Sequence, residues 1–342
     1  MTSSSSSIMI SEESNTLQKL CAVCSRPASD FNYGVQSCNA CKMFFRRHVV
    51  RTVPLRPCTG GESCYNLIPT VHECQCCRFQ KCIQTGMTIL TLLQKTDFHK
   101  TIQTLSEWNY NRNNTIFNCY PTDIDLTVCS IILGPVRYTP RAPYLDFQSW
   151  TYTSTVTTID FMRKFPFLYF SKLQDQEILI KAYFVKVGSL CAAFRAYSEG
   201  NGFLTFPDGS DVLPPGVMSP DLEDLENRIR CRLVGKLTEL QITMEEFLFM
   251  LVILITNPAI PNLSETGRIL SSSYRNLYTS ALFEYCMLTH QKYGPTRLTD
   301  LLSLSHVISK HYEDLNQYFV LLQLNNTVFQ IKYIVREGLD LL

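Results

Sequence analysis

The sequence lacks any apolar segment long enough to cross a membrane. Its longest apolar run covers residues 247–255, whereas a spanning helix needs about 20 apolar residues, so the run predicts a buried helix. The serine-rich residues 1–17 lack the basic leading segment and the apolar core of a secretory signal, and they predict a disordered arm. These absences argue against a membrane partner and predict a compartment in which thiols stay reduced.

The sequence also lacks the common signatures of enzymes that use nucleotides or hydrolyse esters and peptides. It contains no phosphate-binding loop, no dinucleotide-binding glycine fingerprint and no nucleophile elbow. The absence of these motifs predicts that the protein is not an enzyme.

Cysteine is abundant but unevenly distributed. Ten of the 15 cysteines lie between Cys21 and Cys82. Such a cluster fits either a disulfide framework or metal sites, and a reducing compartment favours thiolates bound to metal. A set of unrelated buried thiols is the remaining alternative.

Eight of these cysteines form two sets of four. The first set is two Cys-x2-Cys pairs with 13 residues between them, and the second is a Cys-x5-Cys pair and a Cys-x2-Cys pair with nine residues between them. Four thiolates are the tetrahedral ligand set of closed structural zinc sites. Cys76 competes with Cys77 as a ligand, but only Cys77 completes an x2 pair, so Cys76 and Cys82 are expected to be reduced structural thiols. The sequence therefore predicts two structural Zn²⁺, held by Cys21, Cys24, Cys38 and Cys41 and by Cys58, Cys64, Cys74 and Cys77.

The cysteine-rich region is also basic. Residues 21–87 contain eight Lys or Arg against three Asp or Glu, whereas the whole chain has a formal net charge of +1. A cationic zinc module is typical of nucleic-acid binding, and a solvated basic face without a partner is the alternative.

The segment CNACKMFFRR, residues 38–47, combines metal ligands, an apolar pair and cations. It predicts a helix over about residues 39–50 whose start is fixed by zinc. Phe44 and Phe45 would anchor this helix, and Lys42, Arg46 and Arg47 would project from the other side. A helix with cations on its outer face suits the major groove, where Lys42 and Arg47 can donate to guanine or to phosphates.

The second half of the chain is predicted to be mostly helical. From about Trp150 the apolar residues recur at helical spacing, and the stripe between Leu298 and Leu322 is wide enough for both a core and a partner surface. Residues 200–216 are the only convincing strand-and-turn region.

These motifs resemble those of the nuclear hormone receptors. Both cysteine quartets, CNACKMFFRR and CQCCRFQKCIQTGM (74–87) are similar to the family's DNA-binding domain. Residues 161–181 resemble its ligand-binding-domain signature, with Pro166, Asp175 and Gln176 at the matching spacing. The chain looks like one of the expanded nematode receptors related to hepatocyte nuclear factor 4.

The resemblance implies a small two-zinc nuclear-receptor-type DNA-binding module joined to a mostly α-helical sandwich ligand-binding domain. The function implied is that of a sequence-specific transcription factor that binds double-stranded DNA in the nucleus and regulates RNA polymerase II transcription. Homodimer, heterodimer and monomer all stay open. The expected divisions are a disordered arm (1–17), the DNA-binding domain (18–93), a hinge with a first helix (94–148) and the ligand-binding domain (149–342).

The resemblance also implies roles for residues of the zinc module. Lys42, Met43 and Arg47 fall at base-contacting positions, and residues 59–63 form the loop used for dimer contacts. The family commonly has Glu-Gly where this chain has Asn39 and Ala40, and many members have a basic extension that is missing after Met87. The predicted DNA contacts are Asn39, Lys42, Met43, Arg46, Arg47, Arg51 and Arg78.

In the helical half, the resemblance implies a ligand site and a coregulator groove. Arg195 falls where relatives hold a ligand carboxylate, which suits a small lipophilic, fatty-acid-like ligand. An exposed arginine paired with Glu199 is the alternative, as is a ligand-independent orphan receptor with a filled pocket.

The coregulator groove would bind short helices of coactivators or corepressors. Arg163 and Lys181 fall at one part of this groove, and Glu337, in the C-terminal IVREGL segment, supplies the opposing charge. Such a clamp caps both ends of an amphipathic helix. Gly338 replaces an apolar residue and costs about 1 kcal/mol of helix propensity, which predicts a weak activation helix. The alternative for Glu337 is the solvated end of a terminal helix.

Two other classes of protein were weighed against this interpretation. A zinc-stabilised protein-interaction adaptor of the RING or LIM type usually includes histidine ligands, whereas both quartets here are all cysteine and neither His48 nor His72 completes an x2 pair. A zinc enzyme would keep an open coordination position, whereas four sulfurs close each site.

Overall fold

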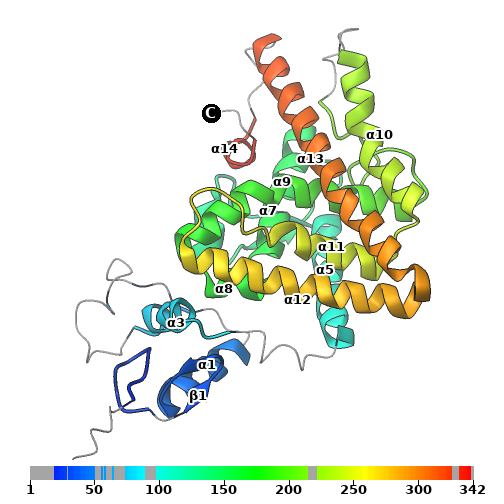
Figure 1. Ribbon diagram of the computed structural model, residues 1–342. Helices are drawn as coiled ribbons and strands as arrows, with labels where there is room; N and C mark the ends of the chain where they lie inside the picture. The colour runs from blue at the N-terminus through cyan, green and yellow to red at the C-terminus, as the bar shows by residue number, and fades with distance from the viewer. Residues whose placement is uncertain are drawn as a thin grey trace, which may run out of the picture.

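The computed structural model shows a small N-terminal module next to a larger helical body (Figure 1). The arm predicted for residues 1–17, the loop 59–63 and Arg51 lie outside the described residues. Among the residues that are described, no helix is long and apolar enough to cross a membrane. The structure describes residues 19–28, 30–50, 55–56, 58, 64, 74–88, 98–214, 222–325 and 331–339.

The N-terminal module is built from a short hairpin and two helices. Strands β1 (Phe31–Asn32) and β2 (Val35–Gln36) pair antiparallel, and Gly34 has a φ of +96° in the turn between them. Helix α1 (Asn39–Val50) follows, and helix α3 (Gln75–Gln84) packs against it. The predicted helix over residues 39–50 is therefore present.

The larger body is made of packed helices with one small sheet. Strands β3 (Cys119–Pro121) and β4 (Tyr138–Pro140) pair antiparallel to form this sheet. The helices are α5 (Phe98–Asn118), α6 (Val128–Leu133), α7 (Phe147–Met162), α8 (Pro166–Phe170), α9 (Leu173–Ser198), α10 (Glu223–Leu240), α11 (Met244–Ile255), α12 (Glu265–His290), the 3₁₀ turn η2 (Gln291–Tyr293), α13 (Gly294–Asn325) and α14 (Tyr333–Arg336).

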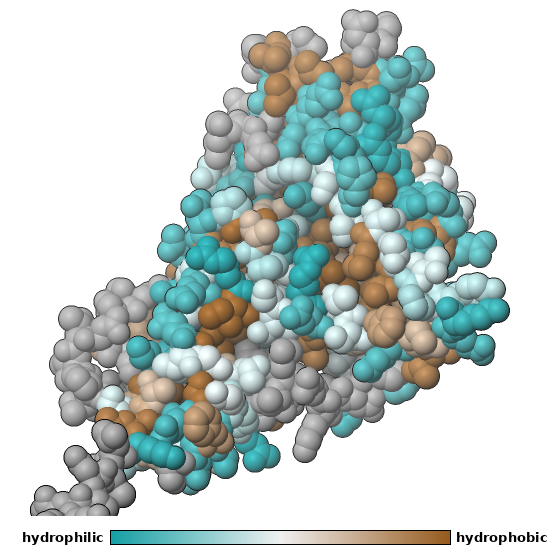
Figure 2. All heavy atoms as spheres, viewed as in Figure 1, coloured by the Kyte–Doolittle hydropathy of each residue, from teal (hydrophilic) through white to brown (hydrophobic). Residues whose placement is uncertain are grey.

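Helices α9 and α11 occupy the centre of the body. Helix α9 contacts α7, α10 and α11, while α11 also contacts α5, α12 and α13. Every residue from Glu246 to Ile255 is buried, so the apolar run at 247–255 is a core helix, as its length predicted. The helices around α9 and α11 thus enclose the core. On the face shown in Figure 2, apolar side chains lie only in separate patches.

The segment before Trp150 contains more structure than the sequence predicted. Helix α5 packs on α7 and α11, and β3, α6 and β4 follow it within the same body. The prediction that residues 200–216 are the only strand-and-turn region is wrong, because β3 and β4 form a hairpin outside it. In the described part of that region, Thr205 and Asp211 form an isolated antiparallel bridge.

The zinc module and the helical body share an aromatic contact. The ring of Phe79 on α3 stacks on Phe45 of α1, with centroids 5.6 Å apart, and on Phe170 of α8, with centroids 4.9 Å apart. Gln80 Nε2 donates to the carbonyl oxygen of Phe170 at 2.7 Å. Burial of these rings joins the two bodies through α3.

A buried ion pair fixes the start of α11 against α13. Glu246 is fully buried, and its carboxylate accepts from Nε of Arg297 at 2.7 Å and from Nη2 at 2.5 Å. It also accepts from the backbone N–H of Thr243, and Arg297 donates to the carbonyl oxygen of Leu240. Arg297 thus supplies hydrogen bonds both to the Glu246 carboxylate and to a carbonyl oxygen at the end of α10.

Replacing Arg297 with leucine is expected to destabilise the fold strongly. The change leaves the Glu246 carboxylate buried without its main counter-charge, which typically costs about 3–5 kcal/mol. Urea denaturation followed by circular dichroism measures the loss. The matched control is Lys310→Leu, which removes an exposed pair with Glu313 and should change the free energy of unfolding by less than about 1 kcal/mol. Equal effects of the two substitutions would contradict a structural role for the buried pair.

Candidate zinc, DNA and ligand sites

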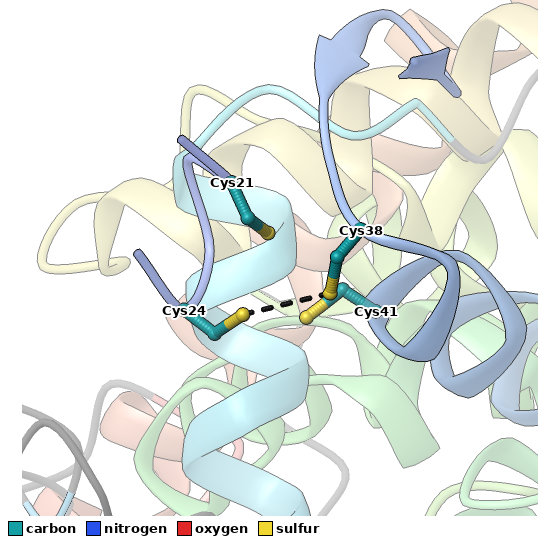
Figure 3. Close-up of side chains that lie close together, drawn as sticks. All are labelled: Cys21, Cys24, Cys38 and Cys41. Carbon is teal, nitrogen blue, oxygen red and sulfur yellow. Dashed lines mark hydrogen bonds between the residues drawn. The ribbon is translucent and has the colours of Figure 1, made fainter. Parts of the chain in front are cut away.

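The first cysteine quartet converges on one point. Cys21 and Cys24 lie on the turn before the hairpin, and Cys38 and Cys41 lie at the start of α1 (Figure 3). Their four sulfur atoms lie within 4.8 Å of one another, and Sγ of Cys24 is 3.6 Å from Sγ of Cys38. The structure therefore brings together the four cysteines that their spacing predicted to be ligands of one metal ion.

The second quartet consists of Cys58, Cys64, Cys74 and Cys77. Its sulfur atoms also lie within 4.8 Å of one another, and those of Cys58 and Cys64 are 3.1 Å apart. Neither Cys76 nor Cys82 belongs to a quartet among the described residues. The structure places Cys77, and not Cys76, with the other three sulfurs of this quartet.

The donor sets fit structural Zn²⁺. Burial raises the pKa of the Cys24 thiol to about 11 and also raises the pKa values of Cys41 and Cys77. Burial also opposes ionisation of Cys21, but backbone hydrogen bonds outweigh it and lower the pKa of that thiol to about 7. Most of the other thiols would remain protonated without a metal, because neighbouring thiolates repel. A divalent ion displaces these protons and offsets the repulsion, and four sulfurs fill the tetrahedral shell of zinc. Each quartet thus provides a closed site that orders the chain around it.

Arg78 supports the first zinc site from α3. Its Nη2 donates to Sγ of Cys41 at 3.4 Å, and its guanidinium lies over the ring of Phe44 at 4.3 Å. Hydrogen bonds to a metal ligand orient the ligand and moderate its charge. Arg78 was predicted to contact DNA, and this inward contact with α1 was not predicted.

Helix α1 has a buried side and an exposed side. Phe44, Phe45, His48 and Val49 are buried against the module. On the other side Asn39, Met43, Arg46 and Arg47 are exposed, and Lys42 is half-buried. No carboxylate occurs in α1. The exposed side therefore presents donors and two apolar side chains, Met43 and Val50, to any partner laid along it.

A cavity of about 130 Å³ lies within the helical body. Apolar residues such as Phe184, Leu204 and Leu339 line much of it, while two arginines, Arg112 and Arg195, supply positive charge. The Arg195 side chain is 13% exposed, so it is not the exposed arginine of the alternative interpretation, although its Nε lies 3.9 Å from Glu199.

The two arginines reach the cavity from different helices. Arg195 on α9 donates to the carbonyl oxygen of Thr205, and Arg112 on α5 donates to Oγ1 of Thr158 at 3.2 Å. Burial lowers the pKa of Arg195; nearby Glu199 raises it, and Arg112 lowers it further. Arg112 was not predicted as a site residue, because residues 88–148 have no strong apolar period that would mark an inward arginine.

His311 on α13 also lines the cavity. It is 1% exposed, and among the described residues neither ring nitrogen has a hydrogen-bond partner. Burial lowers its pKa to about 3, so the imidazole is neutral at physiological pH. A neutral imidazole offers one donor and one acceptor.

The residues predicted for a coregulator groove are ion-paired. Nζ of Lys181 lies 3.0 Å from Oε1 of Glu337 and 2.7 Å from Glu177. Burial opposes the effect, but these two carboxylates raise the pKa of Lys181. The Glu337 side chain is only 5% exposed, so the alternative of a solvated helix end is wrong. Arg163, at the end of α7, lies 2.6 Å from Asp160.

The C-terminal helix α14 has four residues and ends at Arg336, so Gly338 lies after the helix and not within it. The structure also gives Gly338 a steric role: a Cβ at this position would lie 2.2 Å from the ring of Phe184. Tyr312 donates its hydroxyl to the carbonyl oxygen of Gly338 at 2.8 Å. Glycine at this position therefore allows the chain end to pack against α9.

Substitution of one ligand in a quartet is expected to remove one zinc ion. The Cys21→Ser variant should bind one Zn²⁺ per chain instead of two, because an oxygen replaces a thiolate in a closed site. Native mass spectrometry measures the stoichiometry. The matched control is Cys76→Ser, which leaves both quartets complete and should keep two ions; loss of zinc from this control would contradict the assignment.

The zinc module and the helical body each match a known protein family. Residues 19–89 match the family model of the double treble clef zinc finger of C4 type, and residues 135–325 match that of the ligand-binding domain of nuclear hormone receptor. The chain is 44% identical over 337 residues to nuclear hormone receptor family member nhr-167 of Caenorhabditis elegans, covering 95% of this chain and 98% of the relative. It is 37% identical to family member nhr-27 of the same organism, covering 94% and 92% of the two chains. The chain therefore belongs to the nuclear hormone receptor family, whose members are DNA-binding transcription regulators and not enzymes.

Proposed function

We propose that this receptor recognises a specific DNA half-site through the exposed side of α1 and regulates RNA polymerase II transcription in the nucleus. The observation that carries the proposal is a helix whose start is held by a four-cysteine site and whose outer side has donors but no carboxylate. In this geometry Lys42, Met43 and Arg47 contact base edges, while Asn39 and Arg46 contact the flanking backbone.

Two further arginines support the proposed DNA binding, Arg51 by contact and Arg78 by its position. Arg51 follows α1 directly in the sequence and adds a cation at its end. Arg78 contributes by holding α1 in place, because its bond to Cys41 fixes the angle between α3 and the first zinc site. Asn39 and Ala40 in the recognition helix, and the missing basic extension after Met87, support placing the chain with nematode receptors related to hepatocyte nuclear factor 4.

The cavity supports a small anionic ligand. Two guanidinium groups and apolar walls favour a molecule with a carboxylate and a short apolar body, held by Arg195. The volume of about 130 Å³ is below the roughly 300–1,000 Å³ of typical ligand pockets. A full-length fatty acid would therefore need the cavity to expand, and the small volume also favours the second candidate, a ligand-independent receptor.

Charged residues at the ends of α7 and α14 and within α9 favour a binding groove for coregulator helices. Arg163 and Glu337 supply opposite charges, and Lys181 holds Glu337 in place. A cation and a carboxylate so placed bind the free carbonyls and free N–H groups at the two ends of a short helix. Coactivators or corepressors that present such a helix are the expected partners.

Selection from a random duplex DNA pool with the zinc-loaded full chain is expected to enrich a short half-site. Substitution Arg47→Ala should weaken binding to it by about 5–150-fold, because a good side-chain contact to a base contributes about 1–3 kcal/mol. The control Arg26→Ala removes an exposed arginine outside α1 and should preserve the selected sequence. Spacing of paired half-sites in the pool reports whether the receptor binds as a dimer. Failure to enrich any sequence would contradict DNA recognition by α1.

Ligand binding through Arg195 predicts selectivity for acids over alcohols. Octanoate should raise the melting temperature of the full chain, whereas 1-octanol, which has the same chain length without the carboxylate, should not. Arg195→Met should abolish the rise, and Arg137→Met, an exposed arginine on the surface, should not. Thermal-shift measurements over a range of acid lengths test the proposal. No shift with any acid would favour the ligand-independent receptor.

A further inference from the structure

Helix α6 is carried by a loop that projects from the β3–β4 hairpin. The two strands pair Pro121 with Tyr138, and the backbone N–H of Thr122 donates to the carbonyl oxygen of Arg137 at 2.9 Å. Both ends of the loop 122–137 are therefore fixed at one place on the body. The hairpin presents α6 to the surface made by α7 and α9. Helix α6 contacts both of these helices.

The two ends of α6 are held by the two opposite charges of the proposed groove. Oε2 of Glu337 accepts the backbone N–H of Val128, the first residue of α6, at 3.0 Å. At the other end, Nη1 of Arg163 donates to the carbonyl oxygens of Ile131 at 2.8 Å and Gly134 at 2.5 Å. A carboxylate at the N-terminus and a guanidinium at the C-terminus match the unpaired groups and the dipole of a helix.

The apolar side of α6 has the spacing of a helix bound in a groove. Val128, Ile131 and Ile132 lie at positions i, i+3 and i+4, which share one side of a helix. Val128 and Ile131 are 0% exposed, and Ile132 is half-buried, whereas the neighbouring Leu133 is 58% exposed. The buried side of α6 thus faces the body.

Local contacts keep α6 helical although it is short. The Thr127 hydroxyl accepts from the backbone N–H of Ser130, whose own hydroxyl accepts from the N–H of Thr127. Ahead of the helix, Tyr152 on α7 donates its hydroxyl to the carbonyl oxygen of Asp123 at 2.7 Å and accepts from the N–H of Leu126. The segment is therefore folded and oriented for the site that it occupies.

We propose that α6 is an internal occupant of the coregulator groove, and this inference rests on the proposed function of Arg163 and Glu337. The segment takes the place of a partner helix with apolar residues at i, i+3 and i+4. A coregulator helix of this pattern binds only when α6 leaves. Because α6 is tethered at both ends, its effective concentration at the groove is in the millimolar range, and a free helix must overcome that competition.

The occupied groove also connects to the C-terminal helix. The Glu337 carboxylate is shared, with Oε1 facing Lys181 and Oε2 facing the start of α6. Departure of α6 removes one of the two groups that hold Glu337, so the position of α14 and the occupancy of the groove are linked. A ligand in the cavity, which Val335 and Leu339 line, would act on the same chain end.

The test uses a peptide of this chain as a free competitor. The probe is a fluorescein-labelled peptide with the sequence of residues 123–137 and serine in place of Cys129. Its binding to the zinc-loaded full chain is measured by fluorescence anisotropy. The Val128→Ser/Ile131→Ser chain, in which α6 cannot fill the groove, should bind the probe at least about tenfold more tightly than the unmodified chain. Adding Glu337→Gln to that chain should remove the gain.

The matched control is Leu133→Ser, which changes an exposed residue of the same helix and should leave probe binding unchanged. Equal and tight binding to the unmodified and the Val128→Ser/Ile131→Ser chains would overturn the inference but leave the groove as a helix-binding site. No binding to either chain would remove both the inference and the proposed groove. Circular dichroism checks that each chain is folded. If the double variant unfolds, a chain with residues 127–134 replaced by an equal number of Gly and Ser residues takes its place.

Hydrogen exchange gives a second readout that needs no probe. The amides of residues 131–133 should be protected in the unmodified chain and should lose at least about tenfold of that protection in Arg163→Ala, because the helix loses the group that holds its C-terminus. The amides of α11 serve as the internal reference and should stay protected. Unprotected amides in the unmodified chain would overturn the inference.

Discussion

The arrangement of the zinc module depends on a metal ion, because the chain brings together four sulfurs that repel one another as thiolates. Four sulfur atoms within 4.8 Å are unfavourable as anions, and burial penalises their charge further. A divalent cation removes both costs, so folding of the module and binding of the metal are one event. This ion fixes the start of α1, and the stack of Phe45, Phe79 and Phe170 extends the order from α1 through α3 to the helical body.

Charge compensation at helix ends organises the larger body. Arg297 pairs with buried Glu246 and also donates to the carbonyl oxygen of Leu240 at the end of α10, while Glu337 pairs with Lys181 and accepts from the start of α6. In each case one side chain satisfies groups on two elements, because few charged groups can be buried without several partners. The cavity differs, since Arg112 and Arg195 bring two cations to it and Glu199 is partly exposed. This imbalance is the physical basis for expecting an anion there.

The cavity and the groove meet at the C-terminal segment of the chain. Gly338 lies against Phe184, which lines the cavity, and Glu337 faces the groove. One turn of chain therefore lies between the proposed ligand and the proposed partner surface. A ligand that favours one position of this turn can shift the population that is open to a coregulator.

The sequence alone determined the features that depend on short spacing. Two x2 pairs identify a zinc quartet because a tight turn brings both sulfurs to one ion, and the length of the run at 247–255 identified a buried helix. The inward positions of Arg112 and Arg78, and the pairing of β3 with β4 despite Pro121 and Pro140, carried no local signal. The bond between Val128 and Glu337 joins residues 209 positions apart. Only the tertiary structure decides such contacts, because each partner looks like an ordinary helix end until packing brings the opposite group to it.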